Sequence, residues 1–111
     1  MIPMNKVQAG LGAFLDKELI PSLTGWDKVF VGGVATLAVM RLPALLDYYP
    51  MIAALGAYDK KNNQVDVAAL YQAFSPYMDA EPIPAKIPIL NITMRIGKQE
   101  LDALYRYIKE A

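Results

Sequence analysis

The chain has 111 residues, of which 55% are hydrophobic, and its 11 lysines and arginines balance its 11 aspartates and glutamates. This length predicts a single domain over residues 1–111 with a substantial core, and the apolar content excludes a disordered chain. The even charge balance argues against nucleic-acid binding, and the absence of cysteine and histidine excludes disulfides, thiolate chemistry and histidine-based catalysis or metal binding.

The first predicted element is an amphipathic helix from about Asn5 to Leu19. Its apolar residues recur at helical spacing and form one face: Val7, Leu11, Phe14 and Leu15. Pro21 disfavours the helical conformation at the residue before it, so we expect the helix to end there. This start does not resemble a secretory signal, because acidic residues interrupt it, and we expect a cytoplasmic location.

The most informative segment is residues 29–46, VFVGGVATLAVMRLPALL, eighteen residues in which Arg41 is the single charge. A threonine cap at Thr24 with Asp27 three residues later predicts a helix that begins just before this run. Pro43 removes a backbone donor and clashes with the preceding turn, so it predicts a kink or an end near Leu42.

A run as apolar as this one fits either the core of a protein or a bilayer. Crossing a bilayer takes about 20 apolar residues, and an arginine near the membrane centre costs about 2.5–3.5 kcal/mol. We therefore expect a buried central helix, shielded by neighbouring segments or by a second copy of the chain. A membrane anchor formed by residues 29–46 is the alternative. If Arg41 is buried it needs a partner, and Asp47 or a carboxylate of the first helix is expected.

Shorter elements follow the apolar run. Pro50 suits the first turn of a short helix that extends to about Tyr58, and residues 59–63 form a polar turn. Residues 64–65 read as a brief extended piece. Asp66 is a plausible cap for a helix over residues 67–77.

The last third of the chain is expected to hold a connector, a strand and a helix. Residues 78–86 are predicted to form an irregular connector. The segment 87–95 is rich in β-branched residues and is predicted to form a strand. The final helix is predicted from Lys98 to Glu110. Its apolar stripe consists of Leu101, Leu104, Tyr105 and Ile108.

Two segments 34 residues apart resemble each other. Residues 65–74 (VDVAALYQAF) align without gaps on residues 99–108 (QELDALYRYI), and both contain Ala-Leu-Tyr. The similarity suggests two strand–turn–helix units over residues 59–111, after a helical part over residues 1–58. Their extended pieces would pair as a two-stranded ribbon. The predicted fold is thus a mostly helical α+β domain with four to five helices and this small ribbon.

Five residues are candidates for contact with a partner. Aromatic residues and arginine often anchor interfaces. Trp26 precedes the apolar run, while Tyr48 and Tyr49 follow it, which is typical of either a core rim or a membrane-interface belt. Tyr107 lies off the apolar stripe of the last helix, so we expect it to be exposed. Arg41 is the remaining candidate, because it is the one charge in the apolar run.

No catalytic, cofactor or metal site is predicted from the sequence. Residues 59–70 superficially resemble a calcium loop, but Gln64 stands where the loop requires glycine. Leu70 stands where a bidentate glutamate belongs. We therefore expect a protein that is not an enzyme and that binds neither a metal ion nor a cofactor.

The C-terminal half resembles small uncharacterised proteins encoded in phages and prophages of Gram-positive bacteria. The segments that carry the resemblance are VDVAALYQAF, IPILNITMRI and DALYRYIKEA. The resemblance implies a small accessory or structural component, in the cytoplasm or in the virion. Together with the apolar composition, it predicts a non-enzymatic, self-associating structural or protein-interaction module. The alternative is a small membrane-associated, holin-like protein anchored by residues 29–46.

Overall fold

Helices make up most of the computed structural model, which describes residues 1–78, 83–87 and 92–111. Its α-helices are α1 (Met4–Phe14), α2 (Gly25–Met40), α3 (Leu42–Tyr48), α4 (Pro50–Leu55), α5 (Val67–Met78) and α6 (Lys98–Glu110). Its strands are β1 (Ile2–Pro3), β2 (Tyr58–Asp59), β3 (Gln64–Val65), β4 (Ile83–Ile87) and β5 (Ile92–Ile96). The prediction of a mostly helical α+β fold is confirmed. The described residues hold six α-helices in place of four to five, and a three-stranded antiparallel sheet in place of the two-stranded ribbon.

The first helix ends close to the predicted residue, Leu19, but it is not a regular α-helix throughout. After α1 the chain continues through a π-helical segment, η1 (Leu15–Leu19), and a 3₁₀ turn, η2 (Ile20–Ser22). Pro21 lies inside this final turn, where proline is tolerated because a first-turn N–H has no helical partner to lose.

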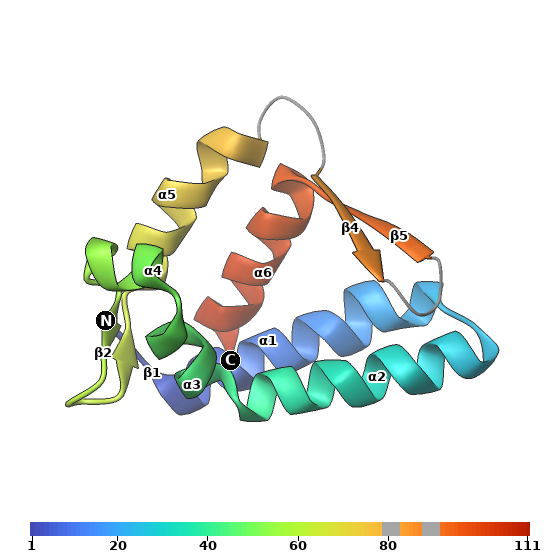
Figure 1. Ribbon diagram of the computed structural model, residues 1–111, viewed down its shortest axis with the longest axis horizontal. Coiled ribbons are helices and arrows are strands. Elements are labelled where there is room, and N and C mark those ends of the chain that lie inside the picture. Colours follow the sequence, from blue (N-terminus) through green and yellow to red (C-terminus); the bar gives the residue numbers. More distant parts are fainter. Residues whose placement is uncertain (79–82, 88–91) are drawn as a thin grey trace.

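The core forms where α1 and α6 cross (Figure 1). Its buried residues come from α1, α3, α4, β3, α5 and α6 and the turns between them: Met4, Val7, Leu46, Ile52, Ala57, Val65, Val67 and Ile108. Gly10 of α1 lies directly against the backbone of Ile108 of α6. The absence of a side chain at Gly10 is what allows the two helix backbones to come so close.

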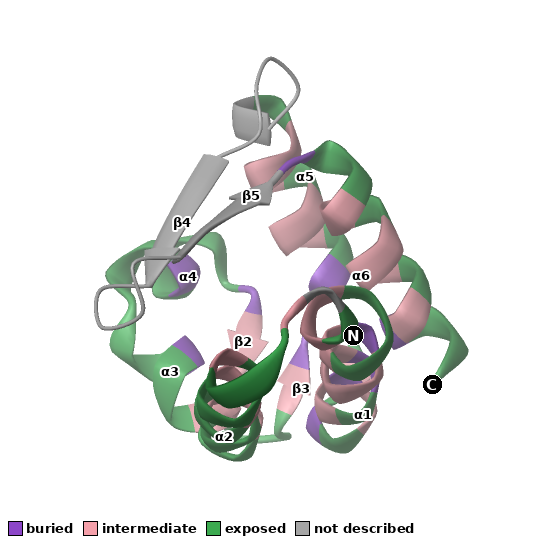
Figure 2. Ribbon diagram, turned by 90° about the vertical axis from the view of Figure 1, so that its right-hand side faces the viewer, coloured by how far each residue is buried: buried purple, intermediate pink, exposed green. Residues whose placement is uncertain are grey.

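The apolar helix α2 is not the centre of this core. It lies alongside α1, and none of its residues is buried. Figure 2, in which α2 is viewed nearly end-on, shows exposed and half-buried residues in this helix and no buried one. The Gln8 side chain of α1 donates a 3.0 Å hydrogen bond to the carbonyl oxygen of Val39, which ties the two helices together. The prediction of a central buried helix is therefore wrong, because α2 packs against α1 along one side and leaves its large apolar side chains exposed.

The chain bends sharply between α2 and α3, as predicted from Pro43. The two helix axes differ by 71°, with Arg41 at the corner and Pro43 in the first turn of α3. Arg41 is exposed, so it does not need the buried partner that was predicted for it. The carboxylate of Asp47 instead forms a 3.0 Å ion pair with Lys60.

Strand pairing differs from the prediction. β3 is the middle strand of an antiparallel sheet with β1 and β2, and β4 pairs with β5 as a separate hairpin. The expected ribbon between residues 64–65 and a strand over residues 87–95 is wrong. The single predicted strand corresponds to parts of β4 and β5, and residues 88–91 within it lie outside the described residues.

A tight turn explains why β3 pairs with β2. The Asp59 carboxylate accepts hydrogen bonds from the backbone N–H of Asn62 at 3.2 Å and from its side-chain amide at 2.8 Å. Asn63 adopts a positive φ of 53°, which asparagine tolerates better than most residues. Closing this short loop costs little conformational entropy, which favours the pairing of β2 with β3.

The two similar segments do meet in the structure. In each, a strand leads through one residue into a helix: Asp66 joins β3 to α5, and Gly97 joins β5 to α6. The Asp66 carboxylate caps α5 by accepting a 3.0 Å hydrogen bond from the N–H of Ala69. The tyrosines of the two Ala-Leu-Tyr sequences, Tyr71 and Tyr105, lie with ring centroids 4.9 Å apart.

The close crossing of α1 and α6 predicts opposite effects for two neighbouring glycines. A Cβ at Gly10 would lie 2.7 Å from the backbone nitrogen of Ile108, whereas a Cβ at Gly12 meets nothing within 4 Å. We expect Gly10→Ala to lower the free energy of unfolding by about 1–3 kcal/mol, because the helices must separate. Gly12→Ala should raise it by up to about 1 kcal/mol, because alanine favours a helix. Urea denaturation of both variants tests this contrast, and equal effects would argue against the crossing.

Candidate functional site

The strongest candidate for a functional surface is the exposed apolar side of α2, which points away from α1 except at Met40, where it borders a groove against α1. Large apolar side chains recur along it at helical spacing and are exposed. We call them the α2 face: Trp26, Val29, Phe30, Val34, Leu37 and Met40. Trp26 is 84% exposed, Met40 67% and Leu37 60%.

The opposite side of α2 explains how this face is left uncovered. Toward α1 the helix carries mostly small residues, among them Gly32, Ala35 and Ala38, which are half-buried. Small side chains let two helices pack closely, so the interface with α1 uses little of the apolar surface. A helix that is apolar on all sides is normally covered on all sides. The α2 face therefore lacks the cover that its composition calls for.

Exposed apolar side chains continue from α2 onto the two following helices. Their members on and beside α3 and α4 are Leu45, Tyr48, Tyr49, Met51 and Leu55. Tyr48 and Tyr49 are in edge-to-face contact with ring centroids 5.3 Å apart, and Tyr48 is 77% exposed. Two adjacent aromatic rings held against each other present a stiff amphipathic contact, which suits a recognition surface.

Charges stand at both ends of the α2 face. Asp27 lies in the first turn and Arg41 follows the last residue. Between them the face itself carries no charged side chain. The Thr36 hydroxyl beside it donates a 2.8 Å hydrogen bond to the carbonyl oxygen of Gly32, so this polar group is satisfied within the helix. The surface is thus apolar along its length and charged at its two ends.

The N-terminal end of α2 differs in one detail from the predicted capping box. Thr24 is the residue that precedes the helix, but its side chain makes no capping hydrogen bond. Gly25 has a φ of +60°, so the first residue of the helix lies outside the helical region that a capping box requires.

Tyr107 is not the exposed aromatic that was predicted. It is half-buried, and its hydroxyl donates a 2.8 Å hydrogen bond to the Glu18 carboxylate. Its ring packs edge-on against Phe14, with centroids 6.2 Å apart, and Lys17 and Arg106 lie over it. Helical spacing could not indicate these contacts, because they join segments that are far apart in the sequence. Tyr107 thus ties α6 to η1.

The other four predicted residues lie on or beside the exposed apolar surface. Trp26 begins the α2 face, Arg41 stands at its far end, and Tyr48 and Tyr49 lie on its continuation. The aliphatic members of the face were not predicted, because an evenly apolar run does not say which side will be covered. The small residues on one side of α2 are the signal that could have indicated it.

Two properties of the described residues bear on other kinds of site. No group of three or more acidic side chains among them could hold a metal ion. No single helix among them is long and apolar enough to cross a bilayer, although α2 and α3 pass that test together as a pair bent by 71°.

Comparison of the chain with protein-family models, with curated proteins and with solved structures finds no match.

Two tyrosine hydroxyls donate hydrogen bonds to carboxylates, so we expect both tyrosines to lose their protons late in an alkaline titration. The hydrogen bond to Glu18 raises the pKa of Tyr107 above its ordinary value of 10.0, and the hydrogen bond to Asp102 raises the pKa of Tyr71 in the same direction. The hydrogen bonds of these two tyrosines contribute fully to stability below pH 10, about the pKa of tyrosine in the unfolded chain. The contribution is lost as the pH rises through the raised pKa values of the folded state.

Near-ultraviolet absorbance should therefore show that two tyrosines of the folded chain ionise at a higher pH than the tyrosines of the urea-unfolded chain. Glu18→Gln removes the charge and should lower the pKa of Tyr107. An unchanged titration curve for this variant would contradict the contact between Tyr107 and Glu18.

Proposed function

We propose that this protein is a non-enzymatic structural or interaction module that associates with itself through the α2 face. The observation that supports it is an apolar helix whose outer side chains are exposed from Trp26 to Met40. Contiguous apolar surface of this kind on a small domain marks a binding surface. Each Å² of it removed from water contributes about 25 cal/mol. The resemblance to phage and prophage proteins agrees with an accessory component of the cytoplasm or the virion.

The arrangement of side chains favours an antiparallel pair of α2 helices related by a twofold axis beside Gly33. In such a pair each residue faces the one equally far from Gly33 on the other side. Trp26 then faces Met40 of the second copy, and Val29 faces Leu37. Gly33 has open space where a Cβ would be, so the two helices can approach closely at the axis.

The charges at the ends of the face agree with this orientation. In the antiparallel pair Arg41 of one copy lies beside Asp27 of the other. The two are offset by two residues along the helix axis, which is about 3 Å at 1.5 Å per residue. Asp27 and Arg41 lie on the same side of α2, so the twofold axis produces this contact between aspartate and arginine twice. A parallel pair would instead place like charges together. The opposed helix dipoles also favour the antiparallel arrangement.

Leu37→Glu tests the proposal directly. It places a charge in the middle of the apolar contact and removes two buried leucines from each pair of chains. We expect the dissociation constant of self-association to rise roughly a hundredfold or more, measured by sedimentation velocity over a range of concentrations.

Ala68→Glu is the matched control, because Ala68 is exposed on α5, away from the α2 face. It adds the same charge and should leave association unchanged. A wild-type chain that stays monomeric at all concentrations, or a Leu37→Glu chain that associates as well as the wild type, would contradict the proposal.

Charge reversal tests the antiparallel orientation. Asp27→Lys or Arg41→Glu alone should raise the dissociation constant about three- to tenfold, because each introduces two like-charge contacts. The double variant Asp27→Lys/Arg41→Glu should return it close to the wild-type value, since both contacts become attractive again. Single variants that associate like the wild type would argue for a different orientation of the helices.

A membrane-associated role is the second candidate, and the bent pair of α2 and α3 is the observation that favours it. In this case the α2 face would contact lipid, with Trp26, Tyr48 and Tyr49 at the level of the headgroups. Flotation with phosphatidylcholine vesicles separates the two roles. A chain that floats with the vesicles and is monomeric without them supports the membrane role.

A further inference from the structure

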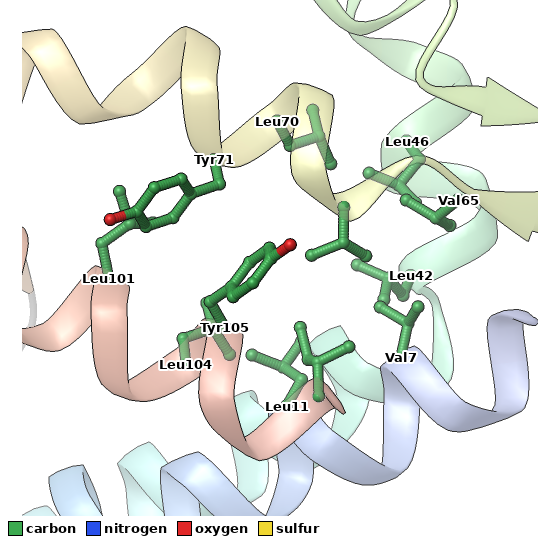
Figure 3. Close-up of a pocket in the computed structure, with 12 residues that line it drawn as sticks. Val7, Leu11, Leu42, Leu46, Val65, Leu70, Tyr71, Leu101, Leu104 and Tyr105 are labelled. Carbon is green, nitrogen blue, oxygen red and sulfur yellow. The ribbon is translucent and has the colours of Figure 1, made fainter. Parts of the chain in front are cut away.

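A second apolar feature, half open to solvent, lies away from the α2 face. It is a pocket of about 150 Å³ between α5 and α6, with α1, α3 and β3 at its inner end (Figure 3). Valine, leucine, isoleucine and tyrosine side chains line it, and no charged side chain is among them.

The pocket has a closed inner end and a more open outer end. Val65, Val67 and Ile108 at the inner end are buried. Leu101 and Leu104 of α6 are half-buried, as is Leu70 of α5. A molecule that enters between α5 and α6 therefore moves from partly exposed apolar surface to surface that excludes water.

The hydroxyls of the two tyrosines in the pocket differ in their partners. The Tyr71 hydroxyl donates a 2.5 Å hydrogen bond to the Asp102 carboxylate, which lies outside the pocket. The Tyr105 hydroxyl points into the pocket, and it makes no hydrogen bond within the described part of the chain (Figure 3). The Lys109 amine lies 4.5 Å from the centroid of the Tyr105 ring. The surface of the pocket is almost entirely apolar, so the Tyr105 hydroxyl contributes only a small polar point to it.

Volume and polarity restrict what can occupy such a space. Cavities of about 150 Å³ with aliphatic and aromatic walls stay dry and bind benzene, because a buried water needs two to four polar partners. This pocket offers one free hydroxyl, so water is held poorly. Drug-sized ligands fill roughly 300–1,000 Å³ and are too large for it.

We infer that this pocket binds a small neutral molecule with a single ring or a short alkyl chain and one hydrogen-bonding oxygen. The apolar body fills the space bounded by Val67, Leu70 and Leu104, and the oxygen meets the Tyr105 hydroxyl. This site is separate from the α2 face and does not depend on the proposed self-association.

Toluene and phenol are suitable probes, because they have equal numbers of heavy atoms and only phenol carries an oxygen. With the full chain, both should produce saturable shifts in the methyl NMR signals of Val67, Leu70 and Leu104. The signals of Val29 and Leu37 on the α2 face serve as the control and should stay in place. No saturable shift up to the solubility limit of toluene, or shifts confined to the α2 face, would overturn the inference.

Tyr105→Phe removes the hydroxyl and so tests its contribution to binding. In this variant the affinity for phenol relative to toluene should fall about fivefold, the usual size of one hydrogen bond. The affinity for toluene itself should be retained. An unchanged ratio would overturn the assignment of Tyr105 as the hydrogen-bonding group.

Leu101→Trp should block the pocket, because an indole ring at the outer end occupies the space, and binding of both probes should weaken at least tenfold. Leu37→Trp is the matched control on the α2 face and should bind both probes like the wild type. Leu101→Trp that folds and binds normally would overturn the inference. If this variant does not fold, as circular dichroism would show, the ratio measured with Tyr105→Phe decides.

Discussion

The close crossing of α1 and α6 at Gly10 and Ile108 is the contact on which the rest of the structure depends. Because Gly10 has no side chain, the two helix backbones meet, and Met4 and Val7 of α1 reach the same core as Ile108. α5 and β3 then close over this pair from the other side. The elements that form the core are thereby drawn to one side of α1.

The position of α2 follows from this arrangement. One side of α1 is occupied by α6 and the core, so the other side is what remains for α2 to pack against. α2 turns its small residues toward α1, and the hydrogen bond from Gln8 to the Val39 carbonyl oxygen holds it there. Its large residues face outward. The same crossing therefore produces both apolar features of the molecule: an inner pocket beside α6 and an outer face on α2.

These two features differ in what they can contact. The α2 face is long, convex and flanked by Asp27 and Arg41, which suits another protein surface with matching apolar side chains and opposite charges. The pocket is small and walled on several sides, with one free hydroxyl from Tyr105, which suits a small molecule. Neither feature places titratable groups together in the way that acid–base catalysis requires.

The sequence by itself determined most of the local structure. Helical spacing located α1, α5 and α6, Asp66 was recognised as a cap, and Pro43 indicated the bend after Arg41. These signals are local, because they depend on neighbouring residues within a turn or two of helix. Tertiary structure alone decided which strands pair and which side of α2 is covered. Both depend on contacts between distant segments. The small residues on one side of α2 favour close packing there, but only the position of α1 decides that this side is the one covered.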